Sequence, residues 1–362
     1  MTDIRYWVGL SLVPDIGPVM SRKLISDMGS PENIFQAGSQ DLLAVRGVGT
    51  EKAASIRAFR NWDRVEKIVK ATEKKGIKIV GYQDSCYPDV LREIDSAPVV
   101  LYMKGDYIKE DRFGIAVVGS RKYTDYGEVV TRKMAGDLAS SGFTIISGMA
   151  RGIDTFSHES ALAAGGRTIA VLGSGLDVYY PAENKGLMEK ISSAGCAVSE
   201  FPPGTMPSKE NFPRRNRLIS GLSLGVLVVE ATSDSGSLIT ANYAIEQNKE
   251  VFAVPGRITS RNSDGTNGLI RQGAKIVLGA ADIIEELAPV LRGFIGRSDL
   301  RPAAEISDEE GRICGFLTRE PKHIDLLSRE SELPVHAILN LLLSLELKGV
   351  VRQAGGKRFY LL

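Results

Sequence analysis

Short runs of apolar and β-branched residues alternate with longer stretches of mixed polarity across residues 76–292. The apolar runs are nearly continuous and fall at residues 115–118, 143–146, 168–172, 197–198, 226–229, 251–254 and 275–278. Continuous apolar runs are typical of parallel strands that are buried on both faces. The stretches between them, such as 128–140 and 237–247, are long enough for crossover helices. The pattern therefore predicts an α/β fold with a doubly wound, mostly parallel sheet, and two further edge strands at 77–80 and 99–103.

Residues 1–75 have a helical pattern instead. One helix-like run is followed by Gly47 and Gly49, which allow a tight hairpin, and Thr50 is placed to cap the next helix. A weaker copy of this pattern spans residues 12–20. Both resemble helix-hairpin-helix (SAM-like) units, whose hairpin N–H groups can hold a DNA phosphate. Bundles of this kind also serve as protein-contact domains, so we expect a helical domain whose role is either of the two.

A third unit, residues 306–362, follows a polar, proline-containing linker at 293–305. The pattern predicts two helices and then two short strands around the glycine pair 355–356, which is the outline of a winged helix. A winged helix that reads DNA exposes basic or amide side chains on its second helix, but here that helix is dominated by leucine. Basic residues of the wing are Arg352, Lys357 and Arg358. We predict a protein-contact or accessory domain, with DNA contact through the wing as the alternative.

Composition narrows the class of protein. At 362 residues, with 43% hydrophobic and 25% charged residues, the chain suggests a globular protein of two or three domains. The net charge of +1 means that any nucleic-acid binding depends on a local patch. The 3 cysteines are far apart, without metal-ligand spacing, which favours a reducing compartment. Since the sequence has neither a signal pattern nor a long apolar run, we expect a cytoplasmic protein that does not enter a membrane.

The loops that follow the predicted strands are rich in glycine, serine and arginine. They lie at 119–127, 147–154, 173–177 and 230–240. In a doubly wound sheet, ligands bind where strands end and helices begin. Glycine lets a phosphate approach the backbone there, and hydroxyl groups can donate to it. Together, the loops predict an anion site at one edge of the sheet.

A cluster of arginines strengthens this prediction. The cluster consists of Arg214, Arg215 and Arg217, within the segment 212–221. Charged side chains packed so tightly repel one another and usually persist because an anion lies among them, and the guanidinium fork matches a phosphate. A helix expected to begin at 218–222 would add its free N–H groups and positive dipole end to the same site. The alternative for the arginine run alone is a solvated basic turn.

Common catalytic and nucleotide-binding patterns are missing from the sequence. Neither the dinucleotide fingerprint G-x-G-x-x-G with its acidic partner nor the P-loop occurs. We find no Ser-His-Asp order and no metal-ligand cluster, and therefore predict no catalytic residue, no metal site and no cofactor. His158 is expected to be a satisfied or surface histidine. Asp154, Asp177 and Glu230 are expected to cap helices or orient loops.

Four longer motifs occur in a fixed order. They are Gly-Ser-Arg at 119–121 with Tyr-Gly at 126–127, Ser-Gly-Met-Ala-Arg-Gly-Ile-Asp at 147–154, Phe-Pro-Arg-Arg-Asn-Arg at 212–217, and Ser-Gly-Ser-Leu-Ile-Thr at 235–240. Together they resemble the DprA/Smf family, the DNA-processing protein A of bacteria. The resemblance implies an extended Rossmann-like domain that binds single-stranded DNA. It also implies a homodimer that loads RecA onto incoming strands in natural transformation, in place of single-strand-binding protein. The helical and winged-helix units have the order seen in longer members.

The same resemblance implies which residues bind DNA. They are Gly119, Ser120, Arg121, Lys185, Arg214, Arg215, Asn216 and Arg217, with Ser237 and Thr240 at a helix start. A groove for single strands combines positive charge with faces on which bases stack. Phe212 and Tyr123 are candidate stacking platforms, as is Tyr126, although ordinary core packing is the favoured interpretation of Tyr126.

The alternative function is a nucleotide-binding or phosphoribohydrolase-like enzyme of a related α/β fold. Such hydrolases carry a Pro-Gly-Gly-x-Gly-Thr-x-x-Glu loop. This chain has the 235–240 motif near that place, without a Gly-Gly pair, and the nearest carboxylate, Glu246, lies further along the helix. We therefore predict a protein that is not an enzyme. A scaffold without any ligand is disfavoured because an unfilled group of arginines is electrostatically costly.

Overall fold

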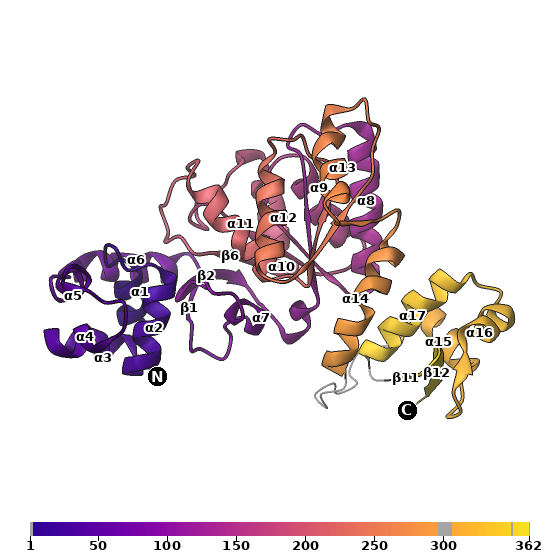
Figure 1. Cartoon of the computed structure of the whole chain (residues 1–362), viewed down its shortest axis with the longest axis horizontal. Helices are drawn as coiled ribbons and strands as arrows, with labels where there is room; N and C mark the ends of the chain where they lie inside the picture. The colour runs from indigo at the N-terminus through magenta and orange to yellow at the C-terminus, as the bar shows by residue number, and fades with distance from the viewer. Residues whose placement is uncertain (1–2, 296–305, 349, 362) are drawn as a thin grey trace.

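The computed structural model describes residues 3–295, 306–348 and 350–361. At its centre is a nine-stranded sheet in the order β1-β2-β6-β5-β4-β3-β7-β8-β9 (Figure 1). Its strands are β1 (Lys78–Gly81), β2 (Val100–Gly105), β3 (Gly114–Val118), β4 (Thr144–Ser147), β5 (Thr168–Val171), β6 (Cys196–Ser199), β7 (Gly225–Val228), β8 (Glu250–Ala253) and β9 (Lys275–Ile276). Pairs among β3 to β9 are parallel, whereas β2 is antiparallel to β1 and β6. The predicted doubly wound, mostly parallel sheet is confirmed.

Helices cover both faces of this sheet. One layer contains α7 (Asp89–Arg92), α11 (Asn211–Gly221), α12 (Gly236–Glu246) and α13 (Asp264–Arg271). The other contains α8 (Asp125–Ser140), α9 (Ile153–Ala163), α10 (Lys185–Ala194) and α14 (Ala280–Ile295). Side chains along a strand point to the two layers in turn. In β5, Ile169 and Val171 pack in the apolar cluster that contains α11, and Ala170 packs in the cluster that contains α10. Because the strands run in parallel, their carboxyl ends bring the predicted loops to one edge.

Two elements differ from the sequence prediction. The strand expected at 275–278 ends at Ile276, because the Leu278 N–H donates to the Asp282 carboxylate (2.7 Å) next to the start of α14 instead of pairing in the sheet. The helix expected to begin near Leu218 begins at Asn211. Pro213 lies in its first turn, where a proline removes no helical hydrogen bond. The arginines are therefore inside α11, and its free N–H groups lie before them.

The N-terminal domain is helical, as predicted. It contains α1 (Ile4–Ser11), α2 (Pro18–Met28), α3 (Pro31–Gln36), α4 (Ser39–Ala44), α5 (Thr50–Arg57) and α6 (Trp62–Lys74). The hairpin between α4 and α5 turns at Gly47, whose φ of 94° is a conformation that favours glycine. Gly49, not Thr50, is the capping residue of α5, and Thr50 is its first helical residue. This helical domain packs directly on the sheet, since Trp7, Tyr102 and Ala197 belong to one continuous apolar cluster.

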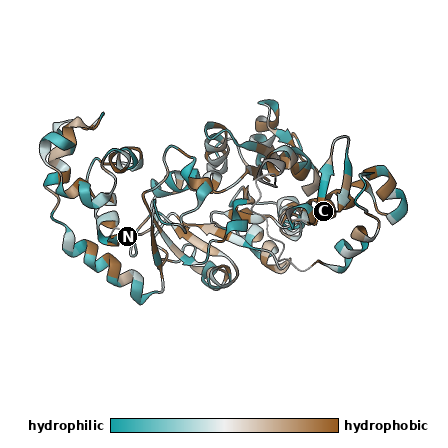
Figure 2. Ribbon diagram, turned by 90° about the horizontal axis from the view of Figure 1, so that it is seen from below, coloured by the Kyte–Doolittle hydropathy of each residue, from teal (hydrophilic) through white to brown (hydrophobic). Residues whose placement is uncertain are grey.

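The C-terminal unit is a winged helix, as predicted, and its described residues form one helix and one short strand more than the two helices and two strands expected. Its elements are α15 (Asp308–Gly315), β10 (Lys322–His323), α16 (Ile324–Ser331), α17 (Val335–Leu347), β11 (Val351–Ala354) and β12 (Arg358–Leu361). The second helix of the motif, α17, packs against α14, because Leu343 joins the cluster of Leu287 and Leu291. Figure 2 shows the chain ends on opposite sides of the molecule. Of the predicted linker 293–305, the first residues belong to α14, and 296–305 lie outside the described residues.

No helix within the described ranges is long and apolar enough to cross a membrane.

Candidate nucleic-acid interface

A cavity of about 430 Å³ lies at the carboxyl edge of the sheet, between the loop after β3, the first turns of α11 and the start of α12. Most of the predicted DNA-binding residues line it, namely Gly119, Ser120, Arg121, Arg215, Asn216, Ser237 and Thr240. Lys185, Arg214 and Arg217 lie outside its lining. The fold thus joins residues that are more than a hundred positions apart in the sequence.

The loop after β3 is held in place by Glu230. The Ser120 N–H donates to the Glu230 carbonyl (2.8 Å), and the buried Glu230 carboxylate accepts from the Thr124 N–H (2.9 Å) and hydroxyl (2.6 Å). A Cβ on Gly119 would lie 2.9 Å from the same Glu230 carbonyl, so only glycine fits there. Glu230 therefore orients the loop, as predicted, and its two carboxylate oxygens are both occupied.

Arg121 projects from this fixed loop and is exposed to solvent. Its guanidinium lies 5.1 Å from the ring centroid of Phe212, within the range of a cation–π contact. The start of α12 lines the same cavity through Gly236 and Ser237, where the positive end of the helix dipole favours an anion, and the Ser235 hydroxyl caps the Ser237 N–H (3.4 Å). Asn216 fixes the distance between α11 and α12 by donating to the Gly236 carbonyl (3.2 Å). An exposed guanidinium and a helix start around one cavity suit a phosphate.

Arg215 lies beneath the cavity and is almost fully buried. Its Nη1 donates to the carbonyls of Gly148 (2.5 Å) and Val171. Burial lowers the pKa of Arg215 to about 10, and the nearby Asp154 acts to raise it. Burial likewise raises the pKa of Asp154, against the effect of the Arg215 charge. Asp154 accepts from the Ala150 N–H (3.2 Å), so it orients the loop after β4, in agreement with the prediction.

Arg217 points away from the cavity, to the other side of α11. Its guanidinium donates to the Ser96 carbonyl (2.6 Å) and the Glu200 carboxylate (2.5 Å). Glu200 Oε1 is buried and has no hydrogen-bond partner among the described residues, and burial raises the pKa of this carboxyl. Arg214 is exposed, 3.8 Å from the same carboxylate, with its guanidinium 5.4 Å from the Phe201 ring centroid. A carboxylate, which the sequence pattern did not reveal, thus offsets part of the arginine cluster.

Two tyrosines of the loop after β5 add aromatic rings near the cavity residue Phe212 and near Lys185. The ring of Tyr180 lies 5.7 Å from that of Phe212, and Lys185 Nζ lies 5.6 Å from the ring of Tyr179. Tyr180 is 45% exposed. We did not predict it from the sequence; the signal available was its place in the loop after β5, at the ligand-binding edge. Lys185 is an exposed cation at the start of α10.

The other predicted platforms lie on the opposite rim. Tyr123 is 42% exposed and packs edge-on against Phe156, at 4.6 Å between ring centroids. Tyr126 is 48% exposed, so the favoured core interpretation was wrong. Its hydroxyl reaches across the surface to the Pro255 carbonyl (2.9 Å), which holds the ring over the start of α8 instead of inside the core.

His158 and Asp177 are not placed for proton transfer in the cavity, since neither lines it. His158 is buried, and Thr168 Oγ1 donates to the Ile145 carbonyl, so the 2.6 Å contact requires a proton on His158 Nδ1. Burial lowers the pKa of His158 to about 3, and its Nε2 has no partner among the described residues. The ring is therefore only half satisfied, in contrast to the prediction. Asp177 has an orienting role, since it accepts from the Gly204 N–H (2.8 Å) and pairs with Lys75.

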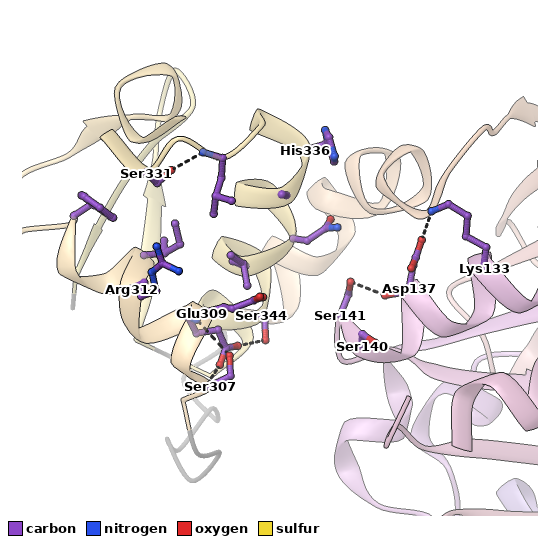
Figure 3. Close-up of a pocket in the computed structure, with 17 residues that line it drawn as sticks. Lys133, Asp137, Ser140, Ser141, Ser307, Glu309, Arg312, Ser331, His336 and Ser344 are labelled. Atoms are coloured by element: carbon purple, nitrogen blue, oxygen red, sulfur yellow. Dashed lines mark hydrogen bonds and ion pairs between the residues drawn. The ribbon is translucent and has the colours of Figure 1, made fainter. Parts of the chain in front are cut away.

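A second cavity, of about 530 Å³, separates the winged helix from α8 (Figure 3). Lys133 and Asp137 of α8 form one wall, where they pair at 2.7 Å. Glu309 and Arg312 of α15 and His336 of α17 lie on the other wall. Cations and carboxylates are mixed here, so this cavity offers no concentrated positive field for a nucleic acid.

Comparisons with known proteins agree with this geometry. A family model described as DNA recombination-mediator protein A matches residues 78–288, more than half of the chain. The Synechocystis protein Smf is 34% identical over 99% of this chain and 98% of its own length. The chain belongs to the DprA/Smf family. Two further models match its flanking domains, a helix-hairpin-helix motif at 5–69 and a DprA winged helix domain at 298–357.

Individual DprA proteins resemble the chain in sequence and structure. DNA processing protein DprA of Streptococcus pneumoniae is 47% identical over 56% of this chain and 72% of its own length. The X-ray structure of DprA from that organism covers 79% of this chain and 99% of its own, with a TM-score of 0.67 and 35% identity. A Helicobacter pylori DprA structure covers 59% and 96%, with a TM-score of 0.53 and 31% identity, and is described as showing a unique single-stranded DNA binding mode.

Proposed function

We propose that the chain binds single-stranded DNA along the carboxyl edge of its sheet. The observation that carries this proposal is the exposed Arg121 guanidinium above Phe212, in the same cavity as the start of α12. Arg121 and the positive end of the α12 dipole hold one phosphate between them, and Phe212 supports a neighbouring base. The description of the Helicobacter pylori relative as a single-strand binder supports the same assignment.

The other predicted residues contribute in different ways. Arg214 and Lys185 are exposed cations outside the cavity lining and bind adjacent phosphates. Arg215 adds a buried positive charge below the phosphate, where it is weakly screened. Gly119, Ser120, Asn216 and Thr240 shape the cavity and supply polar groups. Arg217 acts through its ion pair with Glu200, which fixes the orientation of α11.

These contacts involve phosphates and the faces of bases, so binding is independent of sequence. Such binding suits a protein that protects incoming single strands and then releases them to RecA during natural transformation and recombination. We propose that a homodimer does this, and that it gives RecA access to strands otherwise covered by single-strand-binding protein. RecA-dependent ATP hydrolysis on strands pre-coated with single-strand-binding protein measures the effect. We expect the wild-type chain to accelerate this hydrolysis and Arg121→Ala to lose the effect. Equal acceleration by Arg121→Ala would show that RecA loading does not depend on the cavity.

We also propose that the chain is not an enzyme. Glu230 is engaged by Thr124, and Asp154 is paired with the loop after β4, so neither carboxylate is free to activate water. Steady release of base and ribose phosphate from nucleoside monophosphates, abolished by Glu230→Gln, would support the phosphoribohydrolase alternative instead.

The central test is a titration of a labelled single-stranded oligonucleotide against the duplex of the same sequence, at two salt concentrations. We expect tighter binding to the single strand, with an affinity that falls as salt rises because counterions are released. Equal affinity for the duplex, or binding that does not change with salt, would contradict the proposed site.

A further inference from the structure

We propose that Tyr180 is a second base platform, adjacent to Phe212, and that it contributes to the preference for single-stranded over duplex DNA. This inference rests on the proposed function and adds a residue and a direction to it. A strand whose phosphate is held at Arg121 runs across Phe212 and Tyr180 toward Lys185.

The geometry of the two rings supports a shared ledge. Their centroids are 5.7 Å apart, and their planes are tilted by 38°, so the rings do not cover each other as a parallel stack would. Phe212 is held from behind, because a Cβ on Gly173 would lie 2.9 Å from its Cδ1. Tyr180, at 45% exposure, leaves a large part of its surface open. Tyr180 thus offers open surface to an unpaired base, and the partly buried Phe212 lies beside it.

One cation lies beside Phe212, and a second begins the helix that follows the loop of Tyr180. The Arg121 guanidinium is 5.1 Å from the Phe212 centroid, and Lys185 Nζ is 5.6 Å from the centroid of Tyr179, the neighbour of Tyr180 in the chain. A strand bound at Arg121 and Phe212 therefore has a further ring and a further cation available in this part of the chain. In a duplex the base faces are already covered by their neighbours, so the ledge gives no benefit there.

The test compares two ligands of equal length and charge, a short homothymidine strand and the corresponding abasic strand, which keeps the phosphates and lacks the bases. Wild-type protein is expected to prefer the strand with bases. For Tyr180→Leu, affinity for homothymidine falls roughly 5- to 100-fold, the range of one lost base stack, while affinity for the abasic strand is unchanged. Tyr180→Phe keeps the ring and is expected to bind like wild type.

Each outcome has a distinct meaning. If wild-type protein binds neither strand, the proposed function itself fails. If wild-type protein binds both strands equally well, or if Tyr180→Leu keeps full affinity for homothymidine, the ledge is refuted while the phosphate site stands. Equal losses by Tyr180→Leu on both strands would also refute it, because they show an effect on the fold or the backbone contacts. Should Tyr180→Leu fail to fold, Tyr180→Gln, which also lacks a ring and suits an exposed position, takes its place in the same comparison of the two strands.

Discussion

Replacing Arg121 by alanine is expected to weaken DNA binding without reducing stability. Replacing Arg217 by alanine is expected to reduce stability. Arg121 is exposed at the cavity, so Arg121→Ala should leave the melting temperature nearly unchanged, as for most surface substitutions. If Arg121 neutralises one phosphate, the slope of log affinity against log salt should become shallower by roughly 0.7. Arg214→Ala, at another exposed position, is the matched variant and should behave in the same way.

Arg217→Ala should instead destabilise the fold. The side chains of Arg217 and Glu200 are 8% and 5% exposed, and removing one partner of a buried pair costs about 3–5 kcal/mol. At about 2–4 °C per kcal/mol, the melting temperature should fall by roughly 6–20 °C. Because burial already raises the pKa of Glu200, the uncompensated carboxyl should take up a proton, and the deficit should shrink as pH falls.

Calorimetric melts and anisotropy titrations on the same samples separate the two effects. The double variant Arg217→Met with Glu200→Gln removes both charges and should recover much of the lost stability. The reasoning is refuted if Arg217→Ala melts like wild type, or if it reduces the salt slope while the fold is intact. It is also refuted if Arg121→Ala keeps the full slope.

Three further predictions follow from other features. Because the pKa of His158 is about 3 in the folded chain and about 6.5 when unfolded, stability should fall as the pH drops below 6.5, by about 2 kcal/mol at pH 5, and His158→Asn should flatten this part of the urea-melt profile. A chain ending after Ile295, which keeps α14 whole, should retain most single-strand affinity, whereas residues 306–362 alone should bind poorly in a gel shift; the reverse result would move the site to the winged helix. Nucleoside monophosphates should not be hydrolysed, and a colorimetric assay for released ribose phosphate checks this.

The sequence is sufficient to predict which loops meet at the carboxyl edge of the sheet. Continuous apolar runs indicate parallel strands, and parallel strands bring the loops that follow them together, so the pattern alone places Gly119 and Ser237 in one site. The helical and winged-helix domains also followed from local patterns, because their periodicity and turn residues are encoded over short stretches.

The direction of each side chain was not predictable in the same way. Successive residues of a helix point about 100° apart, so Arg214, Arg215 and Arg217 face three different surroundings once α11 begins at Asn211. Glu200 comes from a separate strand end, and no local pattern links it to Arg217. Tyr180 was missed for a similar reason, since its relation to Phe212 depends on the packing of two distant loops.

The apolar core that the helical domain shares with the sheet makes the helical domain difficult to remove from such a protein. Val100 and Tyr102 of β2 belong to the same apolar cluster as Trp7 of the helical domain and Met188 of α10. Deleting the first 75 residues would expose this apolar surface to water. A relative that lacks the helical domain therefore needs polar side chains at the positions of Val100 and Tyr102, or another protein to cover them. By contrast, the winged helix has an apolar cluster of its own around Ile313, Leu327 and Phe359. Relatives can therefore lose or replace the winged helix with fewer compensating substitutions in the sheet domain.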